Sequence, residues 1–151
     1  MAECIFCEIV AGRSPVSAFY EDDRVLGLLT IGPVTEGHAM VIPKQHAASL
    51  ADLDERTGRH LWTVTQRAAA ALRESGVRCE GVNLFLADGE AAFQEVFHVH
   101  MHVFPRFRGD PFKIVADWDD KPPRAELDRV AGRLRAAYDR LWSGVPVDPA
   151  G

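Results

Sequence analysis

Three histidines stand at alternate positions in the second half of the chain, at His98, His100 and His102. Alternate residues of an extended strand point to the same face, so this spacing predicts a row of three imidazoles. The intervening and flanking positions are apolar and are expected to face the core: Phe97, Val99, Met101 and Val103. A single strand histidine is usually a satisfied polar residue. Three in strict alternation make that ordinary explanation a poor one.

This row permits two kinds of chemistry. Three convergent rings can chelate a catalytic metal ion. Alternatively, one imidazole attacks as a nucleophile while its neighbours orient it and handle protons. The alternation of residues does not separate these two interpretations.

A second reactive group lies near the start of the chain, where Cys4 and Cys7 have the spacing of half a zinc site. The alternatives are a redox dithiol or two small buried residues. A redox pair normally opens a helix after a strand, and a position so close to the start of the chain does not suit that arrangement. The third cysteine, Cys79, has no evident partner and is interpreted as packing.

Hydrophobic patterning predicts the elements that must position these groups. Apolar residues three and four apart predict a helix over Asp54–Ser75, ending before Gly76. A second helix is predicted over Arg124–Trp142 after Pro122-Pro123. The expected buried stripe of the first helix is Leu61, Val64, Ala68 and Leu72, and that of the second is Leu127, Val130, Leu134, Ala137 and Leu141.

Short alternating segments between turn residues predict five strands. Their expected ranges are Ala18–Glu21, Val25–Leu29, His38–Pro43, Val82–Leu86 and Val96–Pro105. Strands and helices do not alternate regularly, which favours an α+β domain built on an antiparallel sheet of about five strands with two main helices. A single domain is expected over residues 1–151, with a loose tail at about 144–151.

The composition excludes some classes of function. Apolar residues make up 47% of the 151 residues and charged residues 26%, a balance typical of a globular protein. The formal net charge of -5 does not favour nonspecific nucleic-acid binding, which requires clustered Lys and Arg. Residues 1–12 do not resemble a signal peptide, and no apolar run is long enough to span a membrane. Together with the odd number of cysteines, this predicts a cytoplasmic protein without nucleic-acid or membrane partners.

The histidine row, written in sequence as HVHMHVF from His98 to Phe104, resembles the signature of the histidine triad (HIT) family. Further matches follow in the family's order over roughly residues 4–106. They are the opening Cys4–Ile9, the segment Gly37-His38 with Val41–His46, Gln94 four residues before the triad, and Pro105-Arg106 after it.

This resemblance implies a nucleotide hydrolase or nucleotidyl transferase that acts at the α-phosphate of a nucleoside 5′-phosphate derivative. The substrate would be a dinucleoside polyphosphate or a nucleotide phosphoramidate, and no catalytic metal is expected. His100 would be the nucleophile and would form a nucleotidyl-histidine, supported by His102, His38 and Gln94. The implied nucleotide-binding residues are Thr30, Ile31, Gln94, His100 and His102. The family also implies a homodimer.

The metal-binding subset of the family implies a structural zinc held by Cys4, Cys7, His46 and His98. Four positions depart from the usual family pattern. Thr30 stands where an Asp commonly accepts the ribose hydroxyls, and Ala87 where Asn is common. Phe93 and Glu95 replace the Gly and the Ser or Thr that usually flank the Gln. Glu95 is expected to point into solvent, and Phe93 to narrow the approach of the backbone to a ligand.

Two rival functions remain open at this stage. The departures at Thr30, Phe93 and Glu95 are compatible with a nucleotide-binding regulatory module that has little turnover. A metallohydrolase that uses the triad as ligands is the other, and it predicts that chelators abolish activity.

Overall fold

The computed structural model describes residues 4–147. Contacts between residues divide the chain into two compact units, residues 1–112 and 113–151. The first unit holds the sheet and all the predicted site residues, and the second holds one helix. No helix in the described part of the chain is long and apolar enough to cross a membrane.

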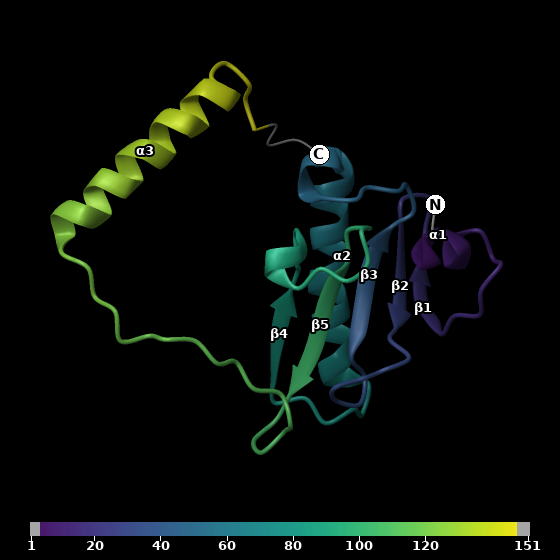
Figure 1. Cartoon of the computed structure of the whole chain (residues 1–151). Coiled ribbons are helices and arrows are strands. Elements are labelled where there is room, and N and C mark those ends of the chain that lie inside the picture. Colours follow the sequence, from purple (N-terminus) through teal and green to yellow (C-terminus); the bar gives the residue numbers. More distant parts are fainter. Residues whose placement is uncertain (1–3, 148–151) are drawn as a thin grey trace. The chain divides into compact units, whose positions relative to one another are not determined.

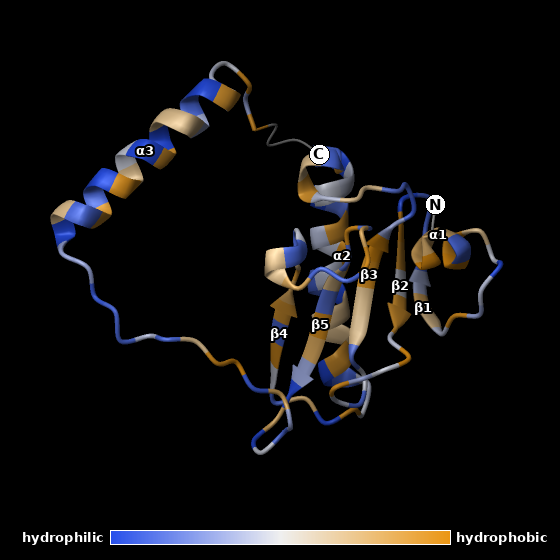
Figure 2. Ribbon diagram, in the orientation of Figure 1, coloured by the Kyte–Doolittle hydropathy of each residue, from blue (hydrophilic) through white to orange (hydrophobic). Residues whose placement is uncertain are grey.

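The first unit is built on a five-stranded sheet in the order β1-β2-β3-β5-β4, in which every neighbouring pair is antiparallel (Figure 1). The strands are β1 (Ala18–Glu21), β2 (Val25–Leu29), β3 (Ala39–Pro43), β4 (Gly81–Phe85) and β5 (Met101–Arg106). The predicted α+β class and antiparallel sheet are therefore confirmed. The central strands are the most apolar, and Figure 2 shows β2 and β3 in orange to tan. Every residue of β3 is buried.

The longest helix, α2 (Glu55–Glu74), covers one face of this sheet and contacts β2, β3 and β5 (Figure 1). It begins where the Asp54 carboxylate accepts a hydrogen bond from the Thr57 N–H at 2.9 Å, which satisfies one of the free amides of the first turn. The predicted stripe of Leu61, Val64, Ala68 and Leu72 is buried. Sequence periodicity therefore located this helix and its buried face correctly.

The predicted fifth strand is too long at its start. Val96–Pro105 was expected, but β5 begins at Met101, so two of the three histidines precede it. The Val99 N–H donates to the Ala47 carbonyl at 2.7 Å, in the loop after β3, and therefore does not continue the sheet ladder. Phe97 was expected in the core and is 47% exposed, because the alternation of a strand does not apply to this segment.

A short helix, α1 (Ile5–Val10), was not predicted. Six residues are too few to show a helical period, and a helix this short depends on tertiary packing rather than on propensity. Phe6 supplies that packing, since its side chain is buried against the core. Two 3-10 turns, η1 (Leu50–Asp52) and η2 (Glu90–Ala92), complete the unit.

In the second unit, α3 (Arg124–Trp142) has the predicted bounds, but the expectation of a buried stripe is wrong. No residue of α3 is buried, and Leu134 and Leu141 are 69% and 67% exposed. Orange and blue segments alternate along it in Figure 2. An amphipathic helix buries its apolar face only against another element, and the described residues of this unit contain none. Residues 148–151 of the predicted tail lie outside the described residues. The prediction of a single domain stays a prediction.

Candidate active site and metal centre

Three imidazoles from two neighbouring segments lie together at the edge of β3 and β5. His38 directly precedes β3, and His102 lies in β5 opposite Met40 of β3. The ring centroids of His38 and His102 are 5.0 Å apart, and those of His100 and His102 are 4.9 Å apart. The structure therefore brings His38, His100 and His102 into one row, although only His102 lies in a strand.

Hydrogen bonds along this row assign the protons of His38 and His102. The Val34 N–H donates to Nδ1 of His38 at 3.4 Å, so the ring proton of a neutral His38 is on Nε2. Nε2 of His38 lies 2.9 Å from Nδ1 of His102 and donates to it. The proton of His102 is consequently on Nε2, which is free to donate to a ligand.

Burial keeps these two rings neutral. The pKa of His38 is lowered from 6.5 to about 4 because burial penalises the charged form. Burial also lowers the pKa of His102 to about 4, with smaller contributions from the charges of His100 and His38. Near pH 7 His102 therefore acts as a hydrogen-bond donor without a positive charge.

His100 is oriented by the backbone of a neighbouring histidine. Its Nδ1–H donates to the carbonyl oxygen of His98 at 2.7 Å. The lone pair of the neutral ring is then on Nε2, and no hydrogen bond from the described residues engages that nitrogen. A buried imidazole with one nitrogen held as a donor and the other bare has the form of a nucleophile or a general base.

A cleft of about 910 Å³ lies against this row. The predicted nucleotide-binding residues Thr30 and Ile31 line it together with His100 and His102. One wall is apolar and comes from α1, through Ile5, Phe6 and Ile9. The Phe6 ring also packs 5.2 Å from the ring of His100. Periodicity gave no indication of this wall, although the matched opening Cys4–Ile9 contains all of it.

Gln94 does not line the cleft. Its side chain is buried, and its oxygen accepts the Gly89 N–H at 2.7 Å. Its amide nitrogen donates to the carbonyls of Ala48 and Val96 at 2.8 and 3.2 Å. These bonds use both of its donors, so Gln94 links the backbone at Gly89, Ala48 and Val96.

The four residues that depart from the family pattern differ in exposure and in whether they line the cleft. Phe93 has φ of 64°, a left-handed conformation that glycine adopts without strain. Its ring is 84% exposed and lines the cleft together with Glu95, which is also exposed. Ala87 is buried. The Thr30 hydroxyl accepts the Gly32 N–H at 3.4 Å, and thus part of its acceptor capacity is used within its own turn.

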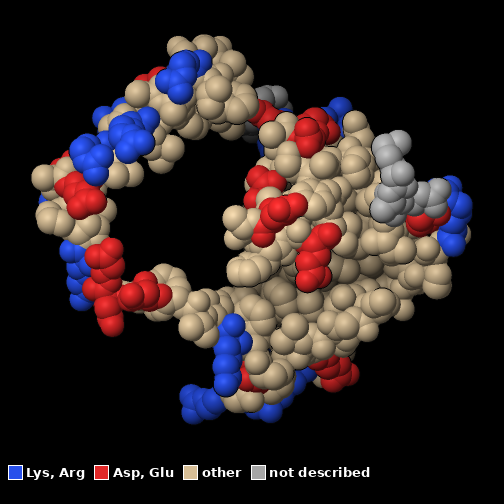
Figure 3. Space-filling model, viewed as in Figure 1, with Lys and Arg blue, Asp and Glu red and all other residues tan. Residues whose placement is uncertain are grey.

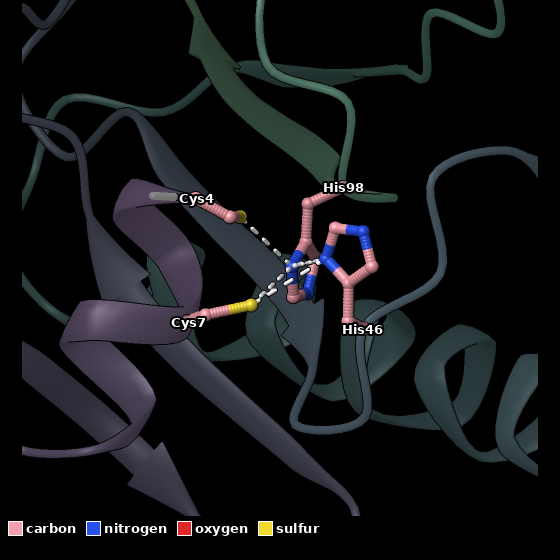
Figure 4. Close-up of side chains that lie close together, drawn as sticks. All are labelled: Cys4, Cys7, His46 and His98. Atoms are coloured by element: carbon pink, nitrogen blue, oxygen red, sulfur yellow. Dashed lines mark hydrogen bonds between the residues drawn. The ribbon is translucent and has the colours of Figure 1, made fainter. Parts of the chain in front are cut away.

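The other members of the predicted site form a separate cluster (Figure 4). Cys4 and Cys7 from α1 and its N-cap, His46 from the loop after β3, and His98 present one ligand atom each. These four atoms all lie within 4.8 Å of one another. Three segments that are distant in sequence thus deliver the Cys2His2 set that zinc prefers.

Four of the six distances between the ligand atoms fit a tetrahedral zinc ion. Ordinary bond lengths place two tetrahedral nitrogens about 3.3 Å apart, and a nitrogen and a sulfur about 3.6 Å apart. The Nδ1 atoms of His46 and His98 are 3.3 Å apart. Nδ1 of His98 lies 3.4 and 3.7 Å from the sulfurs of Cys4 and Cys7, and Cys7 Sγ lies 3.4 Å from Nδ1 of His46.

The surroundings of His98 prepare it as a ligand. Its Nε2–H donates to the Pro43 carbonyl at 2.8 Å, which leaves the lone pair on Nδ1 directed at the cysteines. Burial lowers the pKa of this ring, which keeps it neutral as a ligand must be. Burial and the adjacent Cys4 thiol raise the pKa of Cys7, so metal binding must displace a proton from it. His98 therefore belongs to the candidate metal-binding group, and its carbonyl links that group to His100.

Comparison with known proteins agrees with this geometry. The HIT domain model matches residues 11–109. The chain is 42% identical over 113 residues to a HIT-like protein of Borreliella burgdorferi, covering 74% of this chain and 81% of the relative. It is 34% identical over 148 residues to adenylylsulfatase HINT3 of Arabidopsis thaliana, covering 95% of this chain and 72% of that protein.

A zinc-bound histidine triad family protein from Mycobacterium smegmatis has a similar solved structure. It is 45% identical, and the match covers 92% of this chain and 95% of that one with a TM-score of 0.70. The five-stranded antiparallel sheet, the histidine row and these similarities together establish that the chain belongs to the HIT family.

Proposed function

We propose that this protein is a nucleotide hydrolase or nucleotidyl transferase that attacks the α-phosphate of a nucleoside 5′-phosphate derivative with Nε2 of His100. The observation that carries the proposal is the state of that imidazole. Its Nδ1–H is held by the His98 carbonyl at 2.7 Å, and its other nitrogen is bare beside a cleft. The similarity to an adenylylsulfatase, an enzyme named for a nucleotide substrate, supports this class of reaction.

The reaction would proceed in two displacements. Nε2 of His100 forms a bond to the α-phosphorus while the bond from phosphorus to the leaving group breaks, and the leaving group takes the electron pair and a proton. Water or another acceptor then attacks the phosphorus and loses a proton. The phosphorus–nitrogen bond breaks, and its electron pair returns to His100.

His102 and His38 would support both steps. The Nε2–H of His102 would donate to a non-bridging phosphate oxygen, and this bond strengthens as negative charge develops there. His38 would hold His102 in the required tautomer through the 2.9 Å bond between their rings. Correctly placed donors of this kind contribute about 10²–10⁴ in rate.

The remaining predicted residues would bind the nucleotide or position the loop. The apolar wall of Ile5, Phe6 and Ile9 suits a base, with Thr30 and Ile31 beside the ribose. Gln94 was expected to contact the phosphates or the leaving group, and its bonds to Gly89, Ala48 and Val96 support a positioning role instead.

We also propose a structural zinc ion at Cys4, Cys7, His46 and His98. When bound, zinc would cross-link α1 to the loop after β3 and to the triad segment. Because α1 carries the apolar wall and His98 orients His100, metal binding at this site would stabilise the shape of the cleft. All four available ligands are protein side chains, which is typical of a structural site rather than a catalytic one.

The geometry weighs against a metallohydrolase that uses the triad as its ligands. His98 directs its Nδ1 toward the cysteines, while Nδ1 of His100 faces a carbonyl and Nδ1 of His102 faces His38. In the described residues, the candidate metal group contains only one triad histidine. The homodimer and the cytoplasmic location implied by the sequence stay predictions.

The direct test is to trap the intermediate. Wild-type protein is mixed with adenosine 5′-phosphoramidate, quenched within milliseconds at alkaline pH, digested and analysed by mass spectrometry. An adenylyl group on the peptide containing His100 is expected, and it should be absent from His100→Asn. Tight nucleotide binding without turnover or adduct would favour the regulatory module over the enzyme.

A further inference from the structure

Phe93 is held in a conformation that its side chain disfavours. It is the only non-glycine residue with positive φ in the described part of the chain, at 64°. Burial of the side chain does not offset this strain, since Phe93 is 84% exposed. A strained backbone that presents an exposed aromatic ring at a cleft is a common feature of ligand-binding sites.

Hydrogen bonds hold the backbone around this ring in place. The Phe93 N–H donates to the Glu90 carbonyl at 2.9 Å, and the next residue, Gln94, is fixed by its three side-chain bonds to the backbone. Phe93 and Glu95 flank that anchored residue, and both line the cleft that contains His100. An aromatic ring and a carboxylate are therefore presented together on the loop that precedes the nucleophile.

The charge of the cleft has one sign. Among the described residues that line it, Glu95 is the only Asp or Glu, and none is Lys or Arg. Figure 3 shows Asp and Glu in the middle of the viewed face of residues 1–112, with Lys and Arg toward its margins. A polyanionic leaving group would find no cationic side chain in this lining. A cation would be attracted both to the carboxylate and to the face of an aromatic ring.

We propose that Phe93 and Glu95 form a leaving-group subsite that selects for a positively charged group. This inference rests on the proposed function, because it assigns the side of the cleft that receives the group displaced by His100. The displaced bond breaks with its electron pair going to the leaving atom, which takes a proton from water. The positive charge that the subsite reads is a separate ammonium on the same leaving group.

Three matched probes test this subsite. They are adenosine 5′-phosphoramidates of ethylenediamine, propylamine and β-alanine, whose leaving amines carry a positive, a neutral and a negative second group. For the wild-type protein we expect kcat/KM to fall in that order, with about a tenfold ratio between the cationic and anionic probes. Glu95→Gln should reduce that ratio to about threefold, and Glu95→Lys should invert the order.

Phe93→Leu separates the contribution of the aromatic ring from that of apolar bulk. It should reduce the preference for the cationic probe over the neutral one. Glu90→Gln is the matched control, because Glu90 is an exposed acid on the same loop that does not line the cleft. Its probe order should equal that of the wild-type protein.

The outcomes separate this inference from the function on which it depends. Turnover of all three probes at similar rates, with an adenylyl adduct on His100, would overturn the subsite and leave the enzyme intact. No turnover and no adduct with any probe would overturn the proposed function as well. If Phe93→Leu instead altered the preference between adenosine and uridine probes regardless of amine charge, the ring would belong to the base pocket, and the subsite proposal would be wrong.

Discussion

The proposed metal centre and the proposed catalytic row of His38, His100 and His102 both use histidine, but for different chemistry. His98 and His100 are two residues apart and both buried, yet one faces two cysteines and the other faces a cleft. The difference lies in which ring nitrogen the protein holds. The Pro43 carbonyl accepts the Nε2–H of His98 and leaves Nδ1 free to bind a metal, whereas the His98 carbonyl accepts the Nδ1–H of His100 and leaves Nε2 free for the proposed attack on phosphorus. The hydrogen-bond partner of the second ring nitrogen, more than the residue type, would decide the role of each histidine.

The largest effect expected is on turnover, from His100→Asn. Removal of the nucleophile should lower kcat/KM by about 10⁴ or more while zinc content and melting temperature stay close to those of the wild-type protein. His60→Gln is the control, because His60 pairs with Asp22 away from the cleft. Steady-state rates with adenosine 5′-phosphoramidate measure the loss of turnover, and metal analysis measures the zinc content. A loss of tenfold or less would refute the role of His100.

A substitution in the proposed metal centre should instead change zinc content and stability. Cys7→Ser is expected to lose bound zinc and to lower the free energy of unfolding by about 4 kcal/mol, because metal binding stabilises only the folded chain. Cys79→Ser is the matched control, since the Cys79 thiol donates to the Gly81 carbonyl and lies outside the cluster. Metal analysis and denaturant melts measure the two effects. Full zinc occupancy in Cys7→Ser would contradict the assigned ligand set.

The pH dependence of stability tests whether the His38 and His102 rings are buried in their neutral form. The pKa of both His38 and His102 falls from 6.5 to about 4 on folding. Between these values the unfolded chain binds more protons, so the free energy of unfolding should rise with pH from about 4 to 6.5 and then level off. Each ring should contribute about 3 to 4 kcal/mol, so the rise should be about 7 kcal/mol at most and should shrink in a His38→Asn, His102→Asn variant, as measured by urea melts across this range. Equal slopes in the two proteins would show that the rings are not desolvated.

The smallest effect expected concerns the strained loop beside the row. Glycine adopts the conformation of Phe93 without the steric cost of a Cβ atom. Phe93→Gly should therefore be about 1 kcal/mol more stable than Phe93→Ala. Thermal melts of the two variants give the comparison, and zinc content should be the same in both. An alanine variant of equal or greater stability would show that the backbone relaxes away from this conformation.

Local patterns sufficed for much of the fold. The bounds of β1, β2 and α3 agree with those predicted, and α2 agrees to within one residue at each end. Each of these segments has turn or capping residues at its ends, and the two helices also have an apolar period that repeats within them. The same logic failed for the start of Val96–Pro105, where the Val99 N–H bonds to the Ala47 carbonyl and the strand begins only at Met101.

The sequence by itself determined which residues form the candidate site, because the triad, the cysteine pair and the matched segments are recognisable as residue types at fixed spacing. Tertiary structure alone decided how these residues divide between two clusters. His98 joins Cys4, Cys7 and His46, while His100 joins His38 and His102. Ring tautomers, burial and the partners of Gln94 depend on atoms far away in the chain. No local period encodes them, since each results from packing one segment against another.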